Sequence, residues 1–514
     1  MPGANLDALE QAALDGDDQQ RIELANRLIE YPADSAECQR GLNMLRAAAE
    51  GCHGAAAQWL LGIYYIQTTA LPGAHAEAAH WLERAATAGV APAIDRLANL
   101  YLRGLGVPYS RANALNLLQG LADIGFQRAA WDVGYLLSQD NGDAAAATAF
   151  ARACALAYPP AYYSLGLRFA LGAGVTHDAG FARALLLRAN DVGYPDALAA
   201  ADELAPQNEC SLSAQSWYEL LKQNHAAAKP TLQQLLQDGL TIDFSLKPLI
   251  AKVESYFAAL GHPQFYRNAV GRLEVKAGGG TSVKTAALHW EQLAQRPRVA
   301  VSRNFATREE CAHLIYIAAG ALAQPEQYTG KTLSGLTENS HFTGRGCPLG
   351  ALSSDAVVRT IEQRIAQHSG HTVDTIEPCS IIAYEPGEEY HPHVDFFGFE
   401  QIEHNRKVLK DFSGQRVATF LLCLKAPDAG GETVYDHCGL SITYQTGMAT
   451  LHFNVTSTGA PDARSLHHGR PVKLGQKWLM RTTLRENSLY NARGNSLVSI
   501  DISEPGGGEL IMRQ

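Results

Sequence analysis

The chain has 514 residues and a formal net charge of −10; 46% of its residues are hydrophobic and 18% are charged. This length predicts more than one folded domain, and the composition is that of a globular protein and not of a disordered one. An acidic balance of this size provides no net basic field to attract DNA or RNA, so we expect no nucleic-acid partner.

The sequence also carries no membrane or secretion signal. No uninterrupted apolar run is long enough to span a membrane, and the first residues lack the basic and apolar regions of a signal peptide. The 9 cysteines are scattered, form no Cys-x-x-Cys pair and do not suggest a disulfide framework. We therefore expect a cytoplasmic protein with no membrane partner.

The N-terminal part has the pattern of a helical repeat array. Stretches of small residues end in glycine at intervals of about 36 residues, and a Gly-x-Gly-Val signature occurs twice. The glycines concerned are Gly51, Gly89, Gly125 and Gly193 for the first pattern, and Gly104, Gly106, Gly172 and Gly174 for the second. Alanine and leucine at helical spacing between them predict helix-turn-helix units.

This part resembles the Sel-one-like repeats, which are relatives of the tetratricopeptide repeat, with roughly four or five units. The concave surface of such arrays commonly binds other molecules. The resemblance therefore implies that the array recruits the substrate or a protein partner. The alternative is that the array serves only as a rigid spacer or a dimerisation element.

The chain as a whole is expected to be an α+β multidomain protein, a helical repeat solenoid followed by a double-stranded β-helix (jelly-roll) barrel with flanking helices. Beyond Glu377 short β-rich runs alternate with turn residues, which is typical of a double-sheet jelly roll. The expected segments are an N-terminal helical cap (1–40), the repeats (41–204), a helical extension and linker (205–290), the barrel domain (291–487) and a tail without assigned function (488–514).

A candidate metal site lies in the barrel domain. His393 and Asp395 are two residues apart on an expected strand, so their side chains point to the same face. His467, from a distant strand, would complete a two-histidine, one-carboxylate triad, the ligand set of non-haem Fe(II) oxygenases. Ten residues after His467, Lys477 opens an apolar strand, where its ammonium could hold a carboxylate of a dicarboxylic cosubstrate.

Other histidines were weighed as ligands. His391 has the same strand parity as His393, whereas His468 has the opposite parity to His467 and is not expected to be a ligand. His437 and His452 lie on other predicted segments without a matching motif, and we expect both to be structural.

The segment from about 297 to 484 resembles the prolyl 4-hydroxylase family of 2-oxoglutarate- and Fe(II)-dependent dioxygenases. The matching motifs are Arg298–Val301, Asn304–Ala306, Tyr384-x-x-Gly387, His393-x-Asp395, Arg416–Leu424, Gly430–Thr433 and the Ser-Leu-His-x-Gly-x-Pro-Val-x-x-Gly-x-Lys-Trp run from Ser465 to Trp478.

The resemblance implies a chemistry and a set of roles. His393, Asp395 and His467 would bind Fe(II), and Lys477 would anchor 2-oxoglutarate with Tyr384 and Thr419 as its hydrogen-bonding partners. With O2, and with ascorbate as a candidate reductant, 2-oxoglutarate would be decarboxylated to succinate while a C–H bond is hydroxylated. The expected substrate is a protein or peptide side chain, with proline first.

The resemblance is incomplete on the substrate side. Family members commonly carry an Arg-Thr-Ser element there, whereas the corresponding region here, 338–346, lacks this triplet and offers Arg345 as the candidate for its position. Two alternatives therefore stay open: an oxygenase of a non-protein substrate, and a non-catalytic repeat adaptor with a vestigial barrel.

Overall fold

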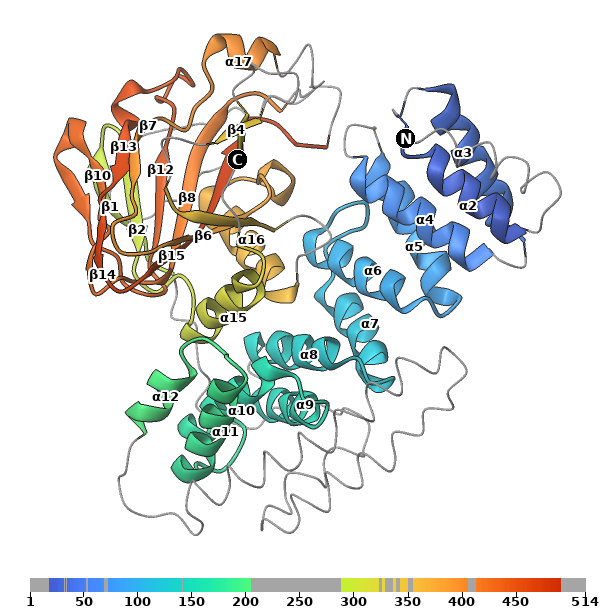
Figure 1. Cartoon of the computed structure of the whole chain (residues 1–514), viewed down its shortest axis with the longest axis horizontal. Helices are drawn as coiled ribbons and strands as arrows, with labels where there is room; N and C mark the ends of the chain where they lie inside the picture. Colours follow the sequence, from blue (N-terminus) through green and yellow to red (C-terminus); the bar gives the residue numbers. More distant parts are fainter. Residues whose placement is uncertain are drawn as a thin grey trace.

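The computed structural model describes residues 18–204 and 288–490, apart from 32, 34, 52–53, 69–72, 141, 323–325, 329–335, 339–342, 350–354 and 405–412. A curved array of helices and a β-sheet domain make up the chain, and two helices of the β-sheet domain lie between them (Figure 1). The first 17 residues of the expected cap, residues 205–287 of the expected extension and linker, and the expected tail from 491 onward lie outside the described residues.

The array consists of helices that pack in consecutive pairs, as the repeat pattern predicted. The helices are α2 (Asp18–Leu28), α3 (Ala36–Ala48), α4 (Gly54–Gln67), α5 (Ala74–Thr87), α6 (Ala91–Arg103), α7 (Arg111–Asp123), α8 (Gln127–Gln139), α9 (Asp143–Ala155), α10 (Pro159–Leu171), α11 (Ala179–Asp191) and α12 (Ala197–Glu203). The expected border between residues 40 and 41 falls inside α3, which pairs with α2. The glycine that follows each stretch of small residues marks the end of a unit. Gly51 is the first of these glycines and follows α3, so the first helix pair begins before the expected border at residue 41.

The Gly-x-Gly-Val signature has a physical reason. Gly104 and Gly172 close α6 and α10 in the left-handed conformation, which glycine adopts without strain. A Cβ atom on Gly106 would lie 2.0 Å from the carbonyl oxygen of His75, and one on Gly174 would lie 2.2 Å from the backbone of Asp143. The second glycine of each signature therefore lets the turn approach the second helix of the preceding unit.

The C-terminal domain contains two main antiparallel sheets. In the larger sheet the order is β1 (Glu291–Gln295), β2 (Arg298–Ser302), β12 (Ala449–Phe453), β8 (Arg416–Lys425), β15 (Lys477–Arg485), β6 (Ser380–Tyr384) and β5 (Arg345–Pro348). In the smaller sheet the order is β11 (Leu440–Ile442), β10 (Thr433–Tyr435), β13 (His467–Gly469) and β7 (Tyr390–His393). Two short pairs are β14 (Val472–Leu474) with β9 (Ala429–Gly430), and β3 (Glu326–Tyr328) with β4 (Leu336–Glu338).

One apolar core joins the inner faces of the two sheets. It contains Val299, Ile382 and Leu479 of the larger sheet, and Tyr435 and Ile442 of the smaller one. This arrangement fits the expected double-stranded β-helix barrel with flanking helices. These helices are α15 (Arg308–Ala319), α16 (Ala356–Ser369) and the short α17 (Phe399–His404). None of the described helices combines the length and the apolar character needed to cross a membrane.

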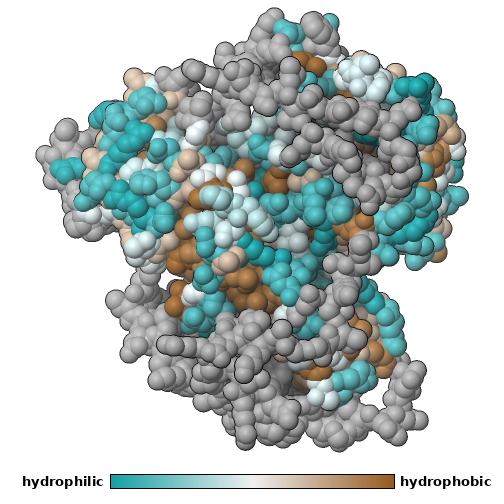
Figure 2. Space-filling view, turned by 180° about the vertical axis from the view of Figure 1, so that it is seen from behind, coloured by the Kyte–Doolittle hydropathy of each residue, from teal (hydrophilic) through white to brown (hydrophobic). Residues whose placement is uncertain are grey.

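The array curves around α15 and α16 of the β-sheet domain (Figure 1). The first helices of three successive units, α6, α8 and α10, contact α15 or α16. A single apolar core continues from Trp131 of the array through Phe305 to Phe420 of the larger sheet, and Trp131 stacks on the His313 ring at 4.1 Å. Seen from behind, hydrophobic residues gather in the middle of the molecule, between more hydrophilic flanks (Figure 2). Much of the inner face of the array is thus occupied by the chain's own β-sheet domain.

Buried polar groups fix this junction. The fully buried Glu310 accepts a hydrogen bond from the Tyr135 hydroxyl at 2.7 Å and two from the Arg364 guanidinium at 2.9 and 3.0 Å. Burial by itself would raise the pKa of Glu310, but the neighbouring Arg364 outweighs it and the pKa is lowered. Arg168 pairs with Glu309 at 3.2 Å across the same junction.

We predict that Glu310→Ala destabilises the full chain by about 3–5 kcal/mol, because it leaves Arg364 as an unpaired buried charge. The measurement is urea denaturation of the full-length protein. The control is Glu50→Ala, which removes a solvent-exposed ion pair with Arg84 and should leave the urea midpoint close to that of the wild type. Equal midpoints for the two variants would show that the junction does not depend on Glu310.

Candidate metal and cosubstrate site

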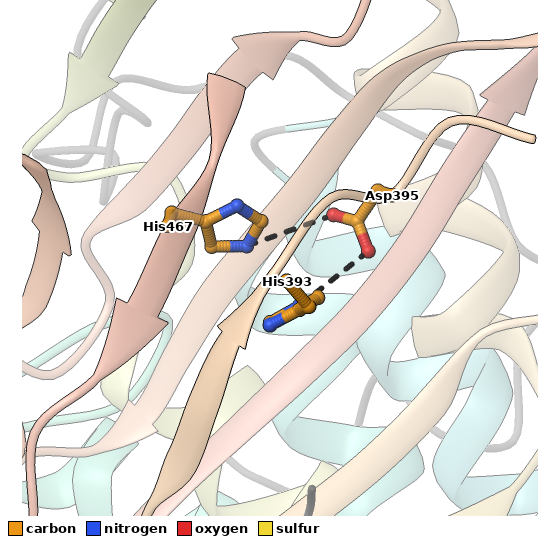
Figure 3. Close-up of side chains that lie close together, drawn as sticks. All are labelled: His393, Asp395 and His467. Carbon is orange, nitrogen blue, oxygen red and sulfur yellow. Dashed lines mark ion pairs between the residues drawn. The ribbon is translucent and has the colours of Figure 1, made fainter. Parts of the chain in front are cut away.

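Three of the predicted side chains converge between the two sheets. His393 ends β7, His467 begins β13, and these residues stand opposite each other in the antiparallel register of the smaller sheet. Asp395 follows two residues after His393. Its Oδ1 lies 3.7 Å from His393 Nε2, and its Oδ2 lies 3.7 Å from His467 Nε2. Figure 3 shows the three side chains turned toward one another, and one ligand atom from each lies within 4.8 Å of the others.

The two imidazoles are held in the orientation that metal binding requires. His393 Nδ1 lies 2.9 Å from the carbonyl oxygen of His391, and His467 Nδ1 lies 2.9 Å from that of Ser465. A carbonyl can only accept, so each Nδ1 carries the proton and each Nε2 keeps its lone pair. Burial lowers the pKa of His393 and lowers that of His467 well below its usual value, which favours the neutral form that binds metals.

Asp395 is buried and surrounded by donors. Arg481 Nη2 donates to Oδ1 at 2.7 Å, and the Thr419 hydroxyl donates to Oδ2 at 2.8 Å. Burial alone would raise the pKa of Asp395, but the charge of Arg481 counteracts burial, and this pKa lies well below its usual value. Two neutral imidazoles and one ionised carboxylate are a donor set suited to a divalent iron.

Lys477 lies in a second, cationic part of the site. Its side chain is buried, its Nζ donates to the carbonyl oxygen of Gly431 at 2.6 Å, and Nζ lies 5.6 Å from the centroid of the Tyr384 ring and 4.9 Å from that of Tyr444. Tyr384 on β6 stands opposite Lys477 in the register. Burial lowers the pKa of Lys477 to about 8. Lys477 and Tyr384 thus lie together, and their contact with 2-oxoglutarate stays a prediction.

Thr419 was expected to bind 2-oxoglutarate, but its contacts in the structure are different. Its hydroxyl gives its one hydrogen to Asp395 and accepts a bond from Asn454 Nδ2 at 3.0 Å. A contact between Thr419 and the cosubstrate therefore has no support in these hydrogen bonds and stays a prediction. Arg345, the candidate for the substrate side, is bound to Glu385 at 2.8 Å.

Sequence reasoning missed two neighbours of Asp395. Arg481 lies four residues after Lys477 on β15, so strand parity alone would have placed both cations on the same face. His452 was expected to be structural, yet its Nε2 lies 3.4 Å from Asp395 Oδ2. It comes from β12, in a segment without a recognisable motif, so no sequence signal linked it to the site.

The sequence is similar to known oxygenases. The family model described as the 2OG-Fe(II) oxygenase superfamily matches residues 379–485. The chain is 31% identical over 238 residues to the probable prolyl 4-hydroxylase 3 of Arabidopsis thaliana, an alignment that covers 42% of this chain and 76% of the relative. It is 33% identical over 207 residues to prolyl 4-hydroxylase 5 of the same plant, with 37% and 68% covered.

Two solved structures are similar to a portion of the chain. A viral collagen prolyl hydroxylase from Paramecium Bursaria Chlorella virus-1 matches with a TM-score of 0.27 and 20% identity, covering 36% of this chain and 95% of that one. A Sel1 repeat protein from Oxalobacter formigenes matches with a TM-score of 0.36 and 26% identity, covering 50% and 77%.

The sequence identity to the Arabidopsis enzymes extends over most of their length, and the family model covers the segment that carries the His-Asp-His cluster. The chain belongs to the prolyl 4-hydroxylase family, and it is a dioxygenase that uses Fe(II), 2-oxoglutarate and O2.

Proposed function

We propose that this protein hydroxylates prolyl side chains of a protein or peptide, with Fe(II) held by His393, Asp395 and His467. The observation that carries this proposal is the convergence of these three side chains in a barrel that also buries the Lys477 side chain. The names of the Arabidopsis relatives, both prolyl 4-hydroxylases, favour proline as the target residue.

Each residue has a separate task in this scheme. Bound Fe(II), with 2-oxoglutarate and O2, supplies the oxidising power for hydroxylation of the C–H bond. The Nε2 atoms of His393 and His467 and the carboxylate of Asp395 would hold the metal. The Lys477 ammonium binds the far carboxylate of 2-oxoglutarate, and Tyr384 orients it. The surrounding rings keep water away from Lys477, which strengthens its charge-assisted hydrogen bond.

We further propose that the array recruits the substrate or a partner through its N-terminal helices, α2 to α5. Contacts of the kind made by α6, α8 and α10 with α15 and α16 are not found for these helices among the described residues. The helices α6, α8 and α10 pack on the catalytic domain, and α5 touches the segment after β15 through His75, whose ring meets Tyr490 edge-on at a centroid distance of 4.3 Å. The array thus serves as a scaffold over part of its length, and the N-terminal units are the surface on which a partner would be sought.

The first prediction concerns the metal. In anaerobic calorimetry, 2-oxoglutarate should bind the full-length protein only when Mn(II) is present as a stand-in for Fe(II), because the cosubstrate binds through the metal. His393→Ala should abolish this binding. His437→Ala, at an exposed histidine, is the matched control and should bind like the wild type. A folded wild-type protein that binds no 2-oxoglutarate under either condition would refute the enzymatic proposal and favour a repeat adaptor.

The second prediction concerns pH. The pKa of Lys477 is about 8 in the free protein, so raising the pH from 7 to 9 removes its positive charge. The dissociation constant of 2-oxoglutarate at saturating Mn(II) should therefore rise above about pH 8, by up to tenfold per pH unit. Lys477→Met should weaken binding about 10- to 100-fold at pH 7, as expected for the loss of a charged hydrogen bond, and should remove the pH dependence.

The control for this experiment is Lys473→Met, which removes an exposed lysine on the neighbouring strand β14. It should keep both the affinity and the pH profile of the wild type. An unchanged pH profile in Lys477→Met would show that another group holds the carboxylate.

The third prediction concerns the substrate. With Fe(II), 2-oxoglutarate and O2, proline-containing peptides should raise succinate formation above the level without peptide, and should gain the mass of one oxygen atom. Matched peptides with alanine in place of proline should do neither. Equal oxidation of the two sets by mass spectrometry would exclude prolyl specificity while leaving the oxygenase itself in place.

A further inference from the structure

His452 is a buried histidine next to the proposed metal site that belongs to none of its matched motifs. It lies on β12 and is fully buried, and its ring packs edge-on against His467 with a centroid distance of 4.6 Å. In the register of the larger sheet it stands opposite Thr419 on β8. Cross-strand neighbours project to the same face of a sheet, so His452 and Thr419 approach Asp395 side by side.

Tyr435 and Asp395 together determine which nitrogen of His452 carries the proton. The Tyr435 hydroxyl lies 2.8 Å from His452 Nδ1. At the other nitrogen, Nε2 lies 3.4 Å from Asp395 Oδ2, an oxygen of an ionised carboxylate that can only accept, so the hydrogen of the imidazole belongs on Nε2 and the Tyr435 hydroxyl donates to Nδ1. His452 Nδ1 is therefore the acceptor, and the imidazole hydrogen sits on Nε2.

The Nε2–H group of His452 points to Asp395. Its distance to Asp395 Oδ2 is 3.4 Å, longer than a normal hydrogen bond, and Nε2 makes no hydrogen bond to any described residue. A buried donor without an acceptor is costly.

Asp395 needs such support because it lies beyond the end of β7. The last residue of that strand is His393, so the β-ladder does not fix the backbone at Asp395. Its carboxylate is instead held from the larger sheet, by Arg481 at Oδ1 and by Thr419 at Oδ2. His452 is the third group on this side and the only one of the three whose donor still lacks a partner among the described residues.

We propose that His452 is a positioning residue whose tautomer is held by Tyr435. Its Nε2–H group holds Oδ2 of the Asp395 carboxylate while Asp395 binds the metal. This inference rests on the proposed function of the same site. An imidazole with its hydrogen on Nε2 cannot ligate through that atom, so His452 acts through Asp395 and not as a fourth ligand. Partners of metal ligands typically change metal affinity 10- to 100-fold.

The test is calorimetric titration of Mn(II) into full-length wild type, His452→Phe, His452→Gln and Tyr435→Phe. His452→Phe keeps the volume but loses the donor, and should weaken Mn(II) binding about 10- to 100-fold. His452→Gln places an amide N–H near the position of Nε2 and should recover most of the affinity. Tyr435→Phe frees the tautomer and should fall between these two variants.

A second readout separates positioning from general damage. At saturating Mn(II), all three variants should bind 2-oxoglutarate with the dissociation constant of the wild type, because Lys477 and Tyr384 are unchanged. Thermal unfolding of the metal-free proteins identifies any variant that does not fold. If His452→Phe does not fold, His452→Gln and Tyr435→Phe decide: Mn(II) binding by Tyr435→Phe that equals the wild type overturns the proposal.

The remaining outcomes are also decisive. Wild-type Mn(II) affinity in a folded His452→Phe would show that His452 only fills space. Loss of binding in His452→Gln as complete as in His393→Ala would make His452 a ligand and overturn its positioning role. Failure of the wild type itself to bind Mn(II) would instead refute the proposed function, and thus differs from failure of this inference alone.

Discussion

The buried carboxylate of Asp395 is the group on which the rest of the site depends. An ionised carboxylate in a protein interior is costly unless it is paired and hydrogen-bonded. Here the ion pair comes from Arg481 on β15 and the hydrogen bond from Thr419 on β8, so the larger sheet stabilises an anion that the smaller sheet places opposite His467. The ionised form of Asp395 is therefore stabilised only when the two sheets pack together.

Strand β15 carries both cations of the site. Lys477 and Arg481 are four residues apart, about 13 Å along a strand, with their side chains on the same face. Arg481 neutralises the charge of Asp395 at one end, and Lys477 is left as a buried cation near Tyr384 and Tyr444 at the other. A dicarboxylate bound as proposed, to both the metal and Lys477, would offset part of this positive charge.

The array adds a structural constraint from outside the barrel. Glu310 lies in the capping box of α15, and the same side chain accepts from Tyr135 of the array and from Arg364 of α16. One buried carboxylate thus caps α15, links α15 to α16 and binds the array. Because α15 also packs on β8, which carries Thr419, the array supports the sheet that holds the metal side of the site.

The sequence predicted the helices, the strands and the motif residues, which follow from local periodicity. It did not predict the contacts that only the tertiary fold brings together. The family motif was enough for the convergence of His393, Asp395 and His467, although Asp395 lies past the end of β7 and not on the expected strand. Glycine spacing was enough for the helix pairs. The occupant of the array's inner face could not be predicted, because it depends on how two distant parts of the chain dock. Arg481 was predictable from the parity of Lys477. His452 was not, because its role depends on a cross-strand register that only the folded sheet defines. Residues such as His452 lie outside the family motif but contact its ligands in the folded sheet. Their role in the site can therefore be recognised only from the structure.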